Sequence, residues 1–120
     1  MINEQQTRDI LLLYKRHGWN LRRVLLSEQS GKLVSDSLKN LFGEAEIISS
    51  GVDAAWFSRA SGAGNEAWEL RRLSGAPFAL VEIFESDDEE DVREEARKEM
   101  ETRLNESASK TIESNQKSKF

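Results

Sequence analysis

The sequence predicts a single α+β domain with a mostly antiparallel sheet of four to five strands and helices packed on one face. Two observations lead to this class. Apolar residues recur at helical spacing near both ends of the 120-residue chain. In residues 46–85 they recur instead with a period of two, in short runs separated by Gly, Ser and Asn clusters. Short connections between the predicted strands favour antiparallel neighbours. The predicted order of elements is α-β-α-β-β-β-β-α.

The first third of the chain predicts two helices around one strand. Residues 3–17 place apolar side chains on one helical face, and Gly18 ends the helix. Residues 19–26 finish in an apolar run that is typical of a strand. Residues 32–42 carry apolar side chains three and four positions apart, which predicts a short amphipathic helix.

Four further strands are predicted over residues 47–50, 53–60, 66–73 and 78–85. The last of them is apolar on both sides, because Leu80 and Phe84 alternate with Val81 and Ile83. A strand of this kind needs cover on both faces of the sheet.

The end of the chain is acidic and predicts one more helix over residues 87–106, with Ser86 as its cap. Its narrow apolar stripe recurs every four residues, and it suits packing along the sheet or pairing with the same helix of a second chain. The stripe consists of Val92, Ala96, Met100 and Leu104. We expect one domain over residues 1–106 and a disordered tail over residues 107–120, which is poor in apolar side chains.

Composition narrows the classes of function. The chain has no cysteine and one histidine, so we expect neither a thiolate metal site nor a cofactor. The net charge is −5, with the excess acid after residue 80, which makes nucleic acid an unlikely partner. The apolar run near the amino terminus is too short for a signal peptide or a membrane span, and we expect a cytoplasmic protein.

Two similar segments, Ala55-Trp56-Phe57-Ser58-Arg59 and Ala67-Trp68-Glu69-Leu70-Arg71, lie on adjacent predicted strands. Trp56 and Trp68 are either core anchors with arginines at the rim of the sheet, or part of an exposed surface of aromatic and arginine side chains. The second interpretation makes Trp56, Arg59, Trp68 and Arg71 the candidate binding residues, because such residues are enriched in protein interfaces. It predicts a non-enzymatic protein-interaction domain that binds a second copy or another protein. No small-molecule substrate is indicated.

Two other functions fit parts of the sequence. Asp53 and Glu69 resemble the acid pair of the PD-(D/E)xK nuclease motif, in which two carboxylates bind magnesium, although Val52 and Arg71 stand where that motif has proline and lysine. Alternatively, three basic pairs could form a weak nucleic-acid-binding patch. They are Lys15-Arg16, Arg22-Arg23 and Arg71-Arg72.

Overall fold

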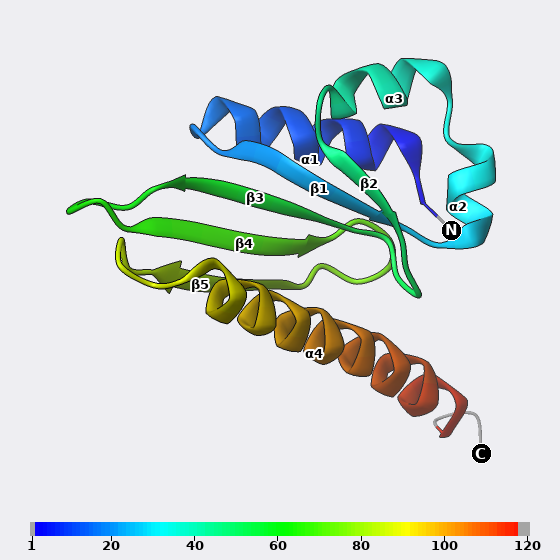
Figure 1. Ribbon diagram of the computed structural model, residues 1–120. Coiled ribbons are helices and arrows are strands. Elements are labelled where there is room, and N and C mark those ends of the chain that lie inside the picture. Colours follow the sequence, from blue (N-terminus) through cyan, green and yellow to red (C-terminus); the bar gives the residue numbers. More distant parts are fainter. Residues whose placement is uncertain (1, 118–120) are drawn as a thin grey trace.

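The computed structural model of the chain describes the backbone of residues 2–117 and the side chains of residues 2–108. This part of the chain forms helices α1 (Glu4–Arg16), α2 (Glu28–Leu33), α3 (Asp36–Phe42) and α4 (Glu90–Lys117), and strands β1 (Asn20–Leu26), β2 (Glu46–Ser49), β3 (Ala54–Ala60), β4 (Glu66–Arg72) and β5 (Ala79–Phe84). The strands form one sheet and the helices pack around it, as Figure 1 shows, so the α+β class is confirmed.

The sheet is mixed, with strand order β2-β1-β3-β4-β5. β1 pairs with β2 in parallel, and the remaining pairs are antiparallel. The short connection after β2 had suggested that β2 and β3 are neighbours, and this prediction is wrong because β1 lies between them. The parallel pair requires a long crossover from β1 to β2, and α2 and α3 form it.

Two short helices replace the single helix predicted over residues 32–42. The hydroxyl of Ser27 accepts a hydrogen bond from the backbone N of Ser30, and that of Ser35 accepts one from Leu38. Each serine is therefore a helix cap. Between the two helices Val34 is extended, which ends the first one. The polar residues 27–31, which lie between the predicted strand and the predicted helix, begin α2.

Helices cover both faces of the sheet, not one as predicted (Figure 1). On the first face, α1 and α3 bury side chains such as Leu11 and Leu38 against Val24 and Phe57. On the second face, α4 packs Met100 against a cluster that contains Trp56, Trp68 and Leu70. The physical reason is that β1 and β3 carry large apolar residues on both sides, so a single helical layer would leave half of them in water.

The apolar stripe of α4 packs along the sheet, which was one of its two predicted roles. Ala96, Met100 and Leu104 belong to the core on that face, whereas Val92 is 56% exposed. The helix does not end near residue 106 but continues to Lys117. The predicted disorder of the tail is not tested over residues 118–120, which lie outside the described part of the chain.

Candidate interaction surface

The two tryptophans of the predicted binding surface lie in the core. Trp56 is 0% exposed and Trp68 is 4% exposed, so the predicted exposed aromatic surface is wrong for both residues. Their rings meet edge to face with centroids 6.0 Å apart. The indole N of Trp56 donates a hydrogen bond of 2.8 Å to Glu101 of α4. Both side chains therefore hold α4 on the sheet, as the core-anchor interpretation predicts.

Arginines pack around Trp68 under α4, where they hold the helix on the sheet. The guanidinium of Arg97 is buried and lies 3.9 Å from the centre of the Trp68 ring. It also pairs with Glu90 at 2.6 Å. On the same face, Arg23 of β1 pairs with Glu94 of α4 at 2.8 Å, and this hydrogen bond lowers the pKa of the Glu94 carboxyl from its usual value. These contacts fix the helix, and neither Trp56 nor Trp68 is exposed on this face.

Arg59 and Arg71 lie on the opposite face, the one that carries α1. Arg59 pairs in register with Ala67, so Arg71 is four residues further along β4, or roughly 13 Å away. Arg59 stacks on Trp19 at 4.3 Å and donates a hydrogen bond to the carbonyl of His17. The two arginines are thus separated from the tryptophans by the sheet and flank a stretch of its other face.

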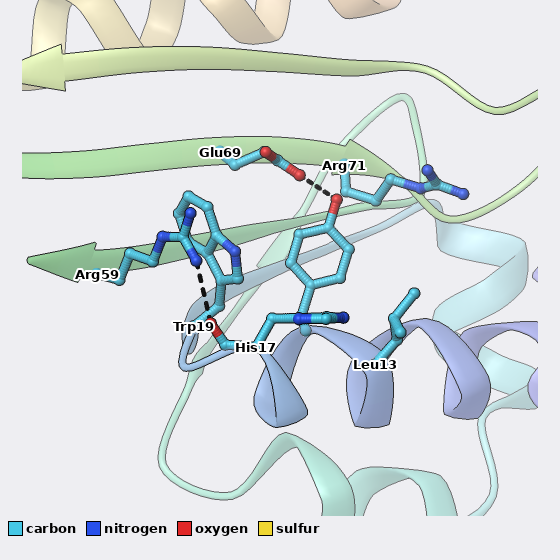
Figure 2. Close-up of a pocket in the computed structure, with 7 residues that line it drawn as sticks. Leu13, His17, Trp19, Arg59, Glu69 and Arg71 are labelled. Carbon is cyan, nitrogen blue, oxygen red and sulfur yellow. Dashed lines mark hydrogen bonds between the residues drawn. The ribbon is translucent and has the colours of Figure 1, made fainter. Parts of the chain in front are cut away.

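A groove of about 360 Å³ runs between the end of α1 and β4, as Figure 2 shows. It is lined by Leu13, Tyr14, His17, Trp19, Arg59, Glu69 and Arg71. Tyr14 crosses the groove: its ring stacks on Phe57 of β3 at 4.1 Å, and its hydroxyl donates a hydrogen bond to Glu69 of β4. Burial raises the pKa of the Tyr14 hydroxyl far above its usual value, and the Glu69 carboxylate acts in the same direction. Tyr14 therefore remains a hydrogen-bond donor at neutral pH.

The sequence indicated three of the groove residues, Arg59 and Arg71 as binding residues and Glu69 as one of an acid pair, but not the groove itself. Tyr14 and Trp19 were assigned to a helix face and to the start of a strand, with no sign that they meet β3 and β4. The apolar position of Tyr14 in α1 was the available signal. It could not reveal a partner 55 residues away in the sequence.

The carboxylates of the proposed nuclease motif do not come together. Asp53 precedes Ala54, which pairs with Arg72, whereas Glu69 pairs with Phe57. The two acids are therefore about four strand positions apart, or roughly 13 Å. Asp53 is 3% exposed and accepts hydrogen bonds from Ser27 and Ser30. Each carboxylate has a structural partner of its own.

A separate acidic cluster follows β5. Glu85, Asp87 and Asp88 bring carboxylate oxygens within 4.8 Å of one another, and all three were part of the predicted acidic run. Asp88 accepts a hydrogen bond from the backbone N of Glu85, which shapes the turn before α4. The side chains of Glu85 and Asp87 are exposed.

The helices leave the α1 side of β4 and β5 partly uncovered, and we call this surface the open half-sheet. It consists of Ala67, Glu69, Arg71, Ala79, Val81 and Ile83. Its β4 part is covered more than its β5 part, because Ala67 is 7% exposed and Glu69 lies against Tyr14. Val81 and Ile83 are each 53% exposed, while Phe84 on the other side of β5 is buried under α4. On α1, Leu13, which lines the groove beside β4, is 46% exposed, and Leu12 on the outer side of the helix is 45% exposed. Four large apolar side chains are thus exposed on α1 and β5.

Comparisons with protein-family models, curated proteins and solved structures found no match. Among the described residues, no helix is long and apolar enough to cross a membrane. The function of the candidate site is therefore inferred from its geometry alone.

Proposed function

We propose that this chain is a non-enzymatic protein-interaction domain that forms a homodimer through the open half-sheet and the outer side of α1. The observation that carries the proposal is the uneven cover of β5. Its apolar residues point to both faces, α4 buries one set, and Val81 and Ile83 remain half exposed. An apolar sheet face with one unshielded half is typical of a surface that a partner covers.

The chemistry of the neighbouring groove supports binding instead of catalysis. Tyr14 and Glu69 satisfy one another, and Arg59 is engaged by Trp19 and by the carbonyl of His17. An active site in contrast needs a reactive group that is aimed at a substrate. Arg71 keeps the predicted role of a binding residue at one end of the surface, and Arg59 of β3 borders the groove beside it. A cytoplasmic location is part of the proposal, and the lack of cysteine is consistent with it.

Light scattering during size-exclusion chromatography tests the proposal. The mass should approach twice the 13.7 kDa of one chain at high concentration. Val81→Glu places a charge in the interface and should shift the protein to one chain mass. Val92→Glu is the matched control, because Val92 is similarly exposed but lies on α4. A single chain mass at every concentration, or equal disruption by both variants, would contradict the proposal.

A further inference from the structure

We infer that α1 of a second copy lies in the open half-sheet, and that a two-fold axis parallel to α1 makes this contact reciprocal. The inference rests on the proposed homodimer and specifies which element of the partner covers which surface. It also places residues of both copies around each groove.

The width of the open half-sheet fits one helix. Neighbouring strands are about 4.8 Å apart, so β4 and β5 present a strip about 10 Å wide. A helix with its side chains has a diameter of about 10–12 Å. On this face α1 contacts β1, and its Tyr14 reaches Phe57 of β3 and Glu69 of β4. The strip therefore begins where Tyr14 covers Glu69 and is open along β5, where a second helix completes the layer.

The outer face of α1 is apolar at its centre and charged at its ends. Asp9, Leu12, Leu13 and Arg16 have the spacing i, i+3, i+4 and i+7, and all four are exposed. The opposite side of the helix is buried through Ile10 and Leu11. In one chain, α1 does not cover the open half-sheet, so both Leu12 and Val81 stay exposed to water. A two-fold axis places Leu12 of each copy on Val81 of the other.

The order of charges selects the direction of the axis. Along the open half-sheet, Arg71 lies at one end, Val81 and Ile83 lie in the middle, and Glu85 follows β5 at the other end. Contacts within one chain define how α1 is aligned with this order. Tyr14 lies at Glu69, and His17 at the end of the helix meets Arg59, which pairs with Ala67. The amino-terminal part of α1 therefore points towards Arg71.

A two-fold axis parallel to α1 preserves this alignment and pairs opposite charges. Asp9 lies five residues before Tyr14, about 7.5 Å along the helix, and Arg71 lies two residues from Glu69, about 6.6 Å along the strand. Asp9 of the second copy thus comes over Arg71, whereas Arg16, two residues or about 3 Å beyond Tyr14, lies on the Glu85 side of Glu69 but about 10 Å short of Glu85. The reversed helix direction would place Arg16 near Arg71 and Asp9 near Glu85, which is repulsive at both ends.

The size of the contact suggests a weak dimer. α1 has 13 residues and is about 20 Å long, so the helix and the strip it covers each contribute a small area. Two such contacts are at the low end of specific interfaces. We therefore expect dissociation in the micromolar range, and the experiment should use protein at about 100 µM.

Disulfide crosslinking tests the arrangement cleanly, because the chain has no cysteine of its own. Leu13→Cys alone should form a crosslinked dimer across the axis. Leu12→Cys and Val81→Cys should each remain uncrosslinked alone and form a dimer when the two variants are mixed. Pairing of two β5 edges would instead crosslink Val81→Cys with itself. That result, or failure of both predicted crosslinks in a protein that is dimeric by mass, overturns the α1 inference and leaves the proposed function standing.

A charge exchange provides the second measurement. Asp9→Arg should weaken dimerisation about tenfold, and adding Arg71→Asp in the same chain should restore most of the affinity, because the pair is then reversed. Sedimentation equilibrium gives both dissociation constants. No recovery in the double variant would contradict the register. A wild-type chain that is monomeric at 100 µM would refute the proposed function itself.

Discussion

Replacement of the buried carboxylate of Asp53 should destabilise the protein strongly, although the sequence alone suggested a catalytic role for this residue. Asp53 is 3% exposed, and both of its oxygens are used. One accepts a hydrogen bond from the backbone N of Ser27 and the other from the hydroxyl of Ser30, each at 2.8 Å. Ser30 in turn accepts a hydrogen bond from the backbone N of Ile2. Asp53 therefore connects the start of α2 and the amino-terminal segment to β3.

The magnitude follows from these two bonds. A hydrogen bond to a charged group contributes about 1.5–3 kcal/mol, and a buried donor that loses its acceptor keeps its desolvation cost. Asp53→Ala should therefore lower the free energy of unfolding by about 3–5 kcal/mol, out of the roughly 5–15 kcal/mol typical of a domain. Asp53→Asn keeps an acceptor for Ser27 and should cost about 1–2 kcal/mol.

Urea denaturation followed by tryptophan fluorescence measures these differences, at one fixed protein concentration because a dimer couples stability to concentration. Asp87→Ala is the control, since Asp87 is an exposed acid and its loss should change the free energy of unfolding by less than about 0.5 kcal/mol. If Asp53→Ala unfolds at the same urea concentration as the wild type, the structural role assigned to this carboxylate is wrong.

Three further predictions concern other contacts. Tyr14→Phe keeps the ring stack but removes the hydrogen bond to Glu69, and it should lower the free energy of unfolding in urea by about 1 kcal/mol; an unchanged urea midpoint would show that this bond contributes nothing. The lowered pKa of Glu94 means that its bond to Arg23 adds stability above the ordinary carboxyl pKa and loses it as the pH falls through the lowered value. The cost of Arg23→Gln, under about 1 kcal/mol for this partly exposed pair, should thus shrink from neutral to acid pH, and a constant cost would contradict the assignment. Gly75→Ala should lower the melting temperature, because φ is +80° there and a residue with a Cβ is strained in that conformation; an unaltered melting temperature would argue against that turn.

Local patterns predicted most of the fold. The period-two residues 53–60, 66–73 and 78–85 form β3, β4 and β5, and helical spacing located α1 and the body of α4. Serine caps and the crossover were harder to predict. A serine cluster after a strand fits a turn as well as a helix cap, and a four-residue connection after β2 does not reveal that β1 is inserted beside it.

The proposed binding surface was predicted only in part, and the reason is geometric. Trp56 and Arg59 are three residues apart on one strand and therefore point to opposite faces of the sheet. The sequence grouped them by proximity, whereas the sheet separates them. The double-sided apolar pattern of β5 was the informative signal. It predicted a need for cover on both faces, and the structure shows that one of them lacks it.

Hydroxyl-radical footprinting over a dilution series tests the central claim most directly, because it measures the solvent exposure of individual side chains. Labelling of Leu12, Val81 and Ile83 should be low at high protein concentration and rise on dilution through the micromolar range, while labelling of Val92 stays constant. If the labelling of Val81 and Ile83 matches that of Val92 at every concentration, the open half-sheet is not the surface at which two copies meet.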